Sequence, residues 1–398
     1  MNRVGSDAGR FASPAQDEPP AIEPAEHASR LAALRRYMAA TDLDVALLSA
    51  PENIFYLTGL DHWGYFVPHL LIVPADEEPV LVTRAMEQVT VANQVRTARF
   101  VGHSDSETAA DAASRVLAGS FRAKRVGLES WSAGLPHGLA ARLMQAHAGV
   151  DWVDISGVVD IQRRVKSPAE QRLMREAARI SDAAAAAAID AVRDGANELD
   201  VAAECQRAMI AAGGTFPGFG PFIRPGARLG EEHTSWGRSV IRGGETVFLE
   251  LSGCCRRYHA PLGRLIFVGS APTAAREMEN VCRRAFDAVL GTLVPGRLAR
   301  EVYAAWQNVV DAAGLGHYRR HHCGYIVGIG VPPSWTGGNS VTGLRHDSDL
   351  PIAEGMSFHV LSWLMGTGRG DYFLSNTVLV TASGPEVLTC IPDGITVR

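Results

Sequence analysis

The sequence predicts an α+β protein in two parts, a smaller α/β domain followed by a larger α+β domain. A chain of 398 residues is too long for one hydrophobic core. Short apolar strands alternate with helical stretches in the first part, and long helices flank runs of apolar strand in the second. With 46% apolar and 20% charged residues, the composition is that of an ordinary soluble globular protein.

Charge and cysteine usage narrow the class of protein. The net charge of −5 argues against nucleic acid or an anionic membrane as the main partner. No apolar run approaches the length of a membrane span, and the N-terminus lacks a basic-then-apolar signal, so we expect a cytoplasmic location. The six cysteines are scattered without a CxxC pair, which indicates reduced thiols rather than a cysteine-ligated metal.

The first domain is expected at residues 28–164. Residues 1–27, rich in Pro, Ala, Asp and Glu, are expected to form a disordered tail. Apolar residues at helical spacing predict a helix from Ala28, and Pro51 to Asn53 are expected to form a turn. Strands are expected at residues 44–51, 69–75, 78–83 and 125–130.

The second domain is expected at residues 165–398 and begins with a long helix. Ser167 can cap this helix, Pro168 fits its first position, and Glu170 completes a capping box. A helix is then expected at 198–212, a strand pair around 250 and 265, helices at 275–293 and 298–313, and strands at 356–361 and 373–380.

Glu250 is an acid inside an apolar strand. Burying an unpaired carboxylate costs several kcal/mol or raises its pKa, so such a charge is either paired or used. His233 lies in the polar loop before this strand, and a His and a Glu on adjacent strand ends can meet as general acid and base. The alternative is a surface-loop His233, with Glu250 in one structural ion pair to Arg257 or Arg264.

His259 and Tyr258 follow in the second strand of this pair. Pro261 blocks regular ladder pairing, which indicates a bulge that can turn both side chains into a cleft. Each can equally be a half-buried strand residue with one satisfied hydrogen bond. His321 and His322 resemble a metal pair, but adjacent positions in a strand face opposite ways, so a solvated loop is expected.

Five phrases stand out in order along the second domain: "VKSPAEQRLMREAARI", "RGGETVFLELSG", "GYIVGIG", "EGMSFHVL" and "NTVLVTASG". Together they resemble the M24 or pita-bread family, which includes methionine aminopeptidase, prolidase, Xaa-Pro aminopeptidase and creatinase. "NIFYLTGLDHWGYF" is similar to the signature of the creatinase-type first domain. The resemblance implies a pita-bread catalytic domain preceded by a smaller α/β creatinase-type N-terminal domain.

Metal-dependent members of that family hold two divalent ions with two Asp, one His and two Glu. In this chain only one of the five matching positions carries a carboxylate, whereas hard cations need several oxygen donors. The resemblance therefore implies that the chain uses no metal or other cofactor and is not a metallopeptidase. The matching positions are Glu250, Pro261, Tyr325, Leu361 and Ser375.

A narrower likeness implies the chemistry. "HTSW", "ELSGCCRRYHAPLGR" and "GYIVGIGVPPSW" are similar to the ectoine hydrolase branch. The implied activity is metal-independent hydrolysis of a C–N bond in a small cyclic amidine or amino-acid derivative. That branch has acids where this chain has Ser334 and Asn376, so the substrate stays open between a relative of ectoine and a different molecule. A lyase or cyclase, or an inactive binding protein with this fold, remains an alternative.

The expected catalytic residues are His233, Glu250 and His259. The resemblance implies that Glu250 pairs with an N–C–N cation or activates water, and that His233 moves the proton to the departing nitrogen. A homodimer is also implied, in which the first domain of one subunit covers the cleft of its partner. The expected substrate-binding residues, each of which can instead be core packing or a structural contact, are Trp63, Tyr65, Trp236, Arg257, Tyr258, Arg264, Tyr325 and Trp335.

Overall fold

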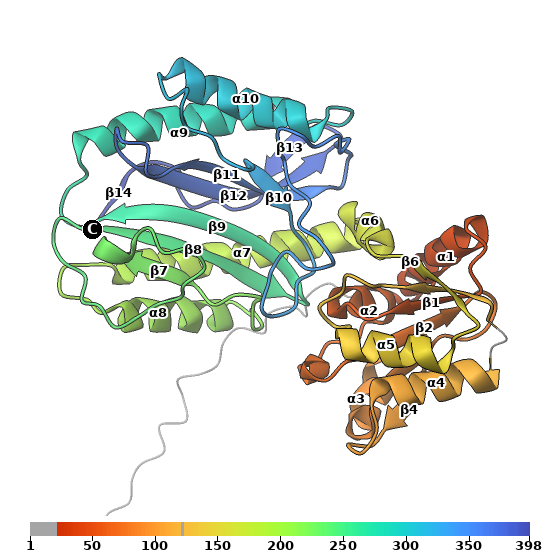
Figure 1. Ribbon diagram of the computed structural model, residues 1–398. Coiled ribbons are helices and arrows are strands. Elements are labelled where there is room, and N and C mark those ends of the chain that lie inside the picture. Colours follow the sequence, from red (N-terminus) through yellow and green to blue (C-terminus); the bar gives the residue numbers. More distant parts are fainter. Residues whose placement is uncertain (1–21, 121–122) are drawn as a thin grey trace, which may run out of the picture.

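The computed structural model describes residues 22–120 and 123–398, and Figure 1 shows a smaller and a larger domain side by side. The smaller domain is built on a six-stranded sheet in the order β4-β3-β2-β1-β5-β6. Its strands are β1 (Val45–Leu48), β2 (Leu70–Pro74), β3 (Val80–Arg84), β4 (Arg99–His103), β5 (Arg125–Leu128) and β6 (Asp151–Asp154). Its helices are α1 (Pro24–Ala40), α2 (Pro51–Thr58), α3 (Gln88–Gln94), α4 (Ala109–Ser120), α5 (His137–Ala146) and α6 (Val158–Arg164).

Both faces of this sheet are buried, which explains the continuous apolar run of β1. Val45 and Leu47 belong to the apolar cluster formed with α4 and α5. Ala46 and Leu48 point the other way, into the cluster that contains α1 and α2. A strand covered on both sides needs apolar residues at every position rather than at alternate ones.

Two expectations for this domain are wrong in detail. Helix α1 begins at Pro24, inside the expected tail of residues 1–27, of which residues 1–21 lie outside the described part. The turn expected at Pro51 to Asn53 is the start of helix α2. Proline is well tolerated in a first helical turn, because the amide it lacks has no intrahelical partner there.

The larger domain is built on an eight-stranded sheet, in which β10-β11-β12-β9-β8-β7 form the main path, β13 pairs with β12 and β14 pairs with β9. The strands are β7 (Phe222–Pro225), β8 (Thr246–Cys255), β9 (Tyr258–Phe267), β10 (Gly324–Ile326), β11 (Ser357–Leu364), β12 (Tyr372–Thr381), β13 (Gly384–Val387) and β14 (Thr396–Val397). The helices are α7 (Pro168–Ala191), α8 (Glu198–Ala211), α9 (Thr273–Thr292) and α10 (Ala299–Ala312).

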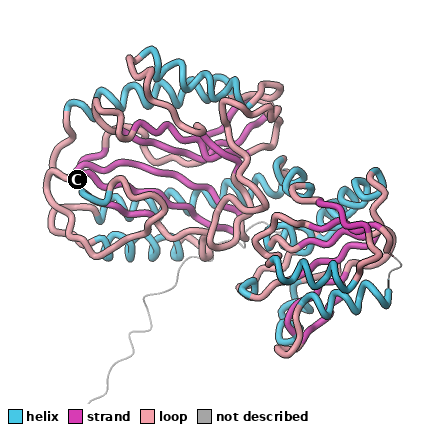
Figure 2. The backbone as a smooth tube through the Cα atoms, viewed as in Figure 1, coloured by secondary structure: helices cyan, strands magenta, loops and turns pink. Residues whose placement is uncertain are grey.

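Helices lie on the outer sides of this sheet. Figure 2 shows the strands between two helical layers, and Figure 1 identifies these as α7 and α8 beside β8 and β9, and α9 and α10 beside β11 and β12. The predicted start of α7 is confirmed: Ser167 Oγ accepts a hydrogen bond from the Glu170 amide at 3.2 Å, and Glu170 Oε2 accepts one from the Ser167 amide at 3.0 Å. Within the described ranges, no helix is long and apolar enough to cross a membrane.

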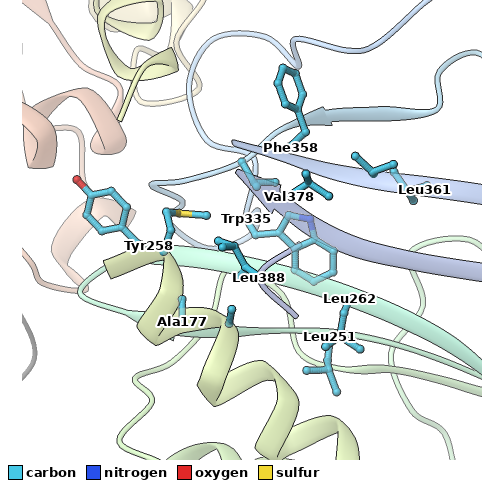
Figure 3. Close-up of a cluster of buried hydrophobic side chains, with 14 of the residues drawn as sticks. Ala177, Leu251, Tyr258, Leu262, Trp335, Phe358, Leu361, Val378 and Leu388 are labelled. Atoms are coloured by element: carbon cyan, nitrogen blue, oxygen red, sulfur yellow. The ribbon is translucent and has the colours of Figure 1, made fainter. Parts of the chain in front are cut away.

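The alternation of β8 decides which side chains face the helices. A Cβ at Gly253 would come within 2.5 Å of the Ala177 carbonyl oxygen, so this position lies directly against α7. Leu251 faces the same way, and Figure 3 shows it on the helix side of the strands, opposite Trp335. Glu250, one position away, therefore points to the other face of the sheet, which we call the inner face.

The bulge expected at Pro261 is not present. The β8–β9 pairing runs without interruption from Thr246 opposite Phe267 to Cys255 opposite Tyr258, with Pro261 opposite Ser252. The pairing of β9 with β12 covers Gly263 and Arg264. Pro261 lies beyond that short ladder, so its missing amide can face a side where pairing does not need it.

Candidate functional site

Strand register places Glu250 at the centre of the inner face. Gly263 of β9 lies directly opposite it, and Gly263 pairs on its other side with Ser375 of β12. A Cβ at Gly263 would lie 2.4 Å from the Phe373 ring and 3.0 Å from Ser375 Oγ. Glycine therefore leaves the space in which the neighbouring side chains meet.

His359 of β11 is close to this carboxyl group, with its Nε2 atom 3.9 Å from Glu250 Oε1. The ring is fully buried, and hydroxyl groups lie at both nitrogens: Tyr325 Oη is 2.8 Å from Nδ1, and Ser375 Oγ is 2.7 Å from Nε2. Burial lowers the pKa of His359 well below its usual value, and positive charge nearby acts in the same direction. The imidazole is thus a neutral group held in one orientation.

Trp335 closes one side of the site. Its indole Nε1 donates a hydrogen bond of 3.1 Å to the Tyr325 hydroxyl. Its ring is 2% exposed, meets Phe219 edge-on at 4.7 Å between centroids, and lies 6.3 Å from the His359 ring. A chain of contacts therefore runs from Trp335 through Tyr325 to His359 and ends beside Glu250.

The electrostatics of Glu250 follow from its burial. Desolvation raises the pKa of Glu250 to about 8, while the guanidinium groups of Arg224 and Arg320 act in the opposite direction. At neutral pH the free protein therefore holds this carboxyl group mostly protonated. A carboxyl group with a pKa near the working pH can both accept and donate a proton in a reaction.

The residues at the family's metal positions do not fit a dinuclear site. Pro261 and Leu361 offer no donor, and the hydroxyls of Tyr325 and Ser375 are hydrogen-bonded to His359. The described residues contain no group of three or more His, Cys, Asp or Glu that could hold a metal ion. Glu250 alone cannot supply the several anionic oxygens that two divalent cations require.

His233 lies at the rim of the same face. Its backbone is left-handed, with φ of 53°, and its side chain is exposed. Its ring centroid is 6.2 Å from that of Phe222, the residue directly opposite Glu250 in the β7–β8 pairing. Phe222 therefore neighbours both residues: His233 lies near its ring, and Glu250 is its partner on the adjacent strand. This places His233 and Glu250 on the same side of the sheet.

Tyr258 and Arg264 lie on the helix side of the sheet, so the expectation that they contact substrate does not fit their placement. Tyr258 pairs with Cys255, and its hydroxyl donates to Glu170 Oε1 at 2.8 Å; Figure 3 shows this hydroxyl pointing away from Trp335. Arg264 is paired with Leu249, next to Glu250 along β8, and alternation turns it outward.

Arg264 instead joins the C-terminal segment to the sheet. Its guanidinium donates to Asn376 Oδ1 at 2.9 Å, to Asp393 Oδ1 at 2.8 Å and to the Ser375 carbonyl at 2.7 Å. The asparagine that stands in place of an expected acid thus serves this network. It does not face Glu250, because Asn376 and the inner-face Ser375 are neighbours along β12.

His259 faces inward, but backbone groups occupy both of its ring nitrogens. The Arg257 carbonyl lies 2.8 Å from Nδ1, and Nε2 accepts a hydrogen bond from the Gly218 amide at 2.8 Å. Burial lowers the pKa of His259 to about 4, so the ring is neutral. Because a Cβ at Gly218 would touch the Ser334 carbonyl at 2.2 Å, His259 positions the loop that packs against Trp335. These contacts favour a positioning role for His259 over the expected catalytic one.

Three expected substrate-binding residues line a separate cavity between the two domains. Trp63, Tyr65 and Arg257 border this space of about 620 Å³, and Ser334 reaches it from the loop that carries Trp335. Arg257 forms an ion pair of 2.5 Å with Asp61 across the domains. The residues that line this cavity do not include Glu250, so these three side chains border a different space.

Trp236 also lies apart from Glu250. It borders a third space, of about 270 Å³, together with Phe216 and Pro217. A Cβ at Gly220 would come within 3.0 Å of its ring, so the indole rests on this loop. Trp236 thus packs against the loop that leads into β7.

Two inner-face residues, His359 and Arg224, were missed by the sequence reasoning. Each is a polar residue inside a short apolar strand, "SFHVLSWL" and "FIRP", which is the signal that singled out Glu250. Both strands are buried at every position. The rule that a buried charged or polar group is either paired or used applies to His359 and Arg224 as it does to Glu250, and it marks both as candidate site residues.

The sequence matches two family descriptions. The profile of metallopeptidase family M24 matches residues 172–382, and the profile of the creatinase/prolidase N-terminal domain matches residues 30–165. These matches confirm the expected pair of domains, a creatinase-type N-terminal domain followed by a pita-bread catalytic domain.

Individual proteins are similar over almost the whole chain. An uncharacterized hydrolase/peptidase of Sinorhizobium fredii is 29% identical over 391 residues, covering 94% of this chain and 98% of its own length. Ectoine hydrolase of Halomonas elongata is 27% identical over 399 residues, with 94% and 97% covered. The structure of an Xaa-Pro dipeptidase from Bacillus anthracis has a TM-score of 0.82 at 21% identity, covering 94% of this chain and 100% of its own, and so shares the fold.

Proposed function

The chain belongs to metallopeptidase family M24, and within this family we propose that it is a metal-independent hydrolase of a C–N bond in a small cyclic amidine, similar in action to ectoine hydrolase. The observation that carries the proposal is the donor set of the inner face. Glu250 stands there with a neutral His359 and two hydroxyls, where a dinuclear site would need several carboxylates. The 27% identity to ectoine hydrolase supports the same substrate class.

The proposed reaction adds one water across the amidine. Glu250, ionised when the cationic amidine binds, takes a proton from water as the water oxygen bonds to the amidine carbon. Glu250 then returns this proton to a ring nitrogen, and the C–N bond breaks. The hydroxyl of the adduct loses its proton as the amide C=O forms, and that proton ends on the departed amine. The products are an amide and an ammonium group, so atoms and charge balance.

His233 and His359 take different parts in this proposal. His233, exposed at the rim, carries the second proton to the departing amine, because one nitrogen of an imidazole ring can accept a proton while the other donates one. His359 stays neutral and fixes the Tyr325 and Ser375 hydroxyls beside the reacting atoms. Because His359 is neutral, Glu250 is the group that pairs with the positive charge of the substrate.

The test is turnover of ectoine in ¹⁸O-labelled water, followed by NMR and mass spectrometry. The proposal predicts ring opening with one ¹⁸O atom in the amide product, and loss of turnover in Glu250→Gln. Glu386→Gln is a matched control, since Glu386 pairs with Arg175 on the surface. A product without label would indicate a lyase or cyclase. No turnover of ectoine or related amidines would favour the inactive binding protein.

We also propose that the chain forms a homodimer through aromatic side chains near the inter-domain cavity. Trp63 is 55% exposed, Phe66 77% and Phe216 54%, and the rings of Trp63 and Phe216 meet at 4.9 Å. Exposed aromatic residues gathered at one place favour burial by a partner. Light scattering should give twice the chain mass for the wild type and the single mass for Phe66→Glu. A wild-type monomer contradicts this proposal.

A further inference from the structure

Arg224 of β7 is a buried cation whose hydrogen-bonding capacity is largely unused. Its side chain is 2% exposed, yet Nε and Nη1 have no hydrogen-bond partner among the described residues. The exposed acid Glu232 forms only a long ion pair with it, with Oε2 4.0 Å from Nη1 and no hydrogen bond between them. Buried guanidinium groups are nearly always satisfied, so an unsatisfied one beside a candidate active site points to a ligand.

Register shows that Arg224 shares the inner face with Glu250. Phe222 lies opposite Glu250 in the β7–β8 pairing, and Arg224, two positions later, lies opposite Phe248. The Arg224 guanidinium carbon lies 4.0 Å from the centre of the Phe248 ring. This contact holds the guanidinium against a ring that offers no hydrogen-bond acceptor of its own, so the N–H groups stay available to a ligand.

A second guanidinium stands on the neighbouring ring. The Arg320 guanidinium carbon is 4.7 Å from the centre of Trp363, and the rings of Trp363 and Phe248 are 5.4 Å apart. The Nε atom of Arg320 is also buried without a hydrogen-bond partner among the described residues. Two cations with unused donors thus lie close enough to Glu250 to act on its pKa, which is an arrangement that an anion would complete.

The same sheet contains a buried arginine that is fully used. Arg264 is 0% exposed and donates to Asn376, to Asp393 and to several backbone carbonyls. This chain therefore satisfies a buried arginine where the role is structural. The contrast indicates that the unused donors of Arg224 serve to bind a ligand reversibly.

We propose that Arg224, with Arg320 beside it, binds a carboxylate group of the substrate while Glu250 holds its cationic N–C–N end. This inference rests on the proposed function and narrows the substrate class to small zwitterions, amidines that carry a carboxylate. A guanidinium edge matches a carboxylate with two parallel hydrogen bonds. An amidine without the carboxylate would leave both arginines unsatisfied and is therefore a poor substrate.

Stability of the free protein tests the role of Arg224 without any substrate. Arg224→Met removes an unsatisfied buried charge, so its thermal midpoint stays at or above that of the wild type. Arg264→Met is the matched control and lowers the midpoint strongly, because it leaves several acceptors without a donor. A loss in Arg224→Met as large as in Arg264→Met would make Arg224 structural and overturn the inference.

Binding tests the carboxylate itself. Calorimetry should compare ectoine, which carries a carboxylate, with the same methylated tetrahydropyrimidine ring lacking it, and with acetate. Wild type is expected to bind ectoine about 100-fold more tightly than the ring without carboxylate, and Arg224→Met to lose that difference. Arg238→Met, at an exposed arginine, is expected to behave as wild type.

The outcomes separate this inference from the proposed function. Carboxylate binding that depends on Arg224 without turnover of ectoine supports the inference and contradicts the proposed function. Turnover of ectoine with equal binding by wild type and Arg224→Met supports the function and overturns the inference. If the wild type binds neither ectoine nor acetate, the inference is overturned as well.

Discussion

The carboxyl group of Glu250 and the imidazole of His359 lie 3.9 Å apart on the inner face of the sheet, and burial opposes charge on both. It raises the pKa of Glu250 to about 8 and lowers the pKa of His359. The free protein therefore presents a protonated acid and a neutral base at neutral pH. A cationic substrate changes this balance, because its charge favours the ionised form of Glu250.

The pH dependence of turnover follows from this pair. If Glu250 acts as the base, kcat/KM reports its ionisation in the free protein, where burial raises its pKa to about 8. For an amidine that stays cationic, kcat/KM should rise about tenfold between pH 7 and pH 9 and then level off. Initial rates at low substrate concentration measure this. A flat or falling profile over the same range contradicts the assignment of Glu250 as base.

Stability should depend on pH in a way that Glu250→Gln removes. The pKa of Glu250 is about 8 in the folded protein, against about 4.3 for glutamate in an unfolded chain. Between these values the folded state binds more protons, so its stability falls as pH rises. From pH 5 to pH 9 the free energy of unfolding should drop by roughly 4 kcal/mol more in wild type than in Glu250→Gln. Urea unfolding measures it, and parallel curves would contradict it.

The Tyr325 hydroxyl accepts a hydrogen bond from Trp335 Nε1 and lies 2.8 Å from His359 Nδ1. Tyr325→Phe leaves the buried indole N–H without its acceptor, which should lower the free energy of unfolding by about 1–3 kcal/mol. Turnover should fall too, because His359 loses one of the groups that orient it. Tyr65→Phe is a control of the same chemistry, since that hydroxyl makes one long bond of 3.4 Å. Equal effects of the two variants would contradict the role of Tyr325.

His259 is predicted to act through structure rather than by proton transfer. His259→Ala leaves the Gly218 amide and the Arg257 carbonyl without their partners, and should lower the free energy of unfolding by about 1–3 kcal/mol. Turnover should fall while the shape of the kcat/KM profile against pH stays that of wild type. A variant that keeps its stability but loses the rise above pH 7 would return His259 to a catalytic role.

The sequence alone predicts the groups of this site better than their directions. Glu250 stands out because an acid in an apolar strand demands a partner or a use, and Ser167 and Glu170 reveal a helix start because a capping box is local chemistry. Tyr258 and Arg264 are adjacent in sequence to inner-face positions but point to the helices. One step along a strand reverses a side chain, and only long-range register fixes which face is inner.

His359 and Tyr325 show the same limit from the other side. They meet because β10 pairs with β11, two strands separated by a long loop, and their pairing brings Tyr325 directly opposite His359. Local pattern marks each as a polar group in an apolar setting, but no local signal joins them. The position of Gly263 between Glu250 and Ser375 depends likewise on three strands at once.

The most direct test is turnover of ectoine by protein stripped of metal with a chelator, with the residual metal content measured by mass spectrometry on the same sample. We predict an unchanged kcat at far less than one metal ion per chain. We also expect no gain on adding Mn²⁺ or Co²⁺, because the described residues contain no group of three or more His, Cys, Asp or Glu that could hold such an ion. Turnover that disappears with the metal and returns with either ion would contradict it.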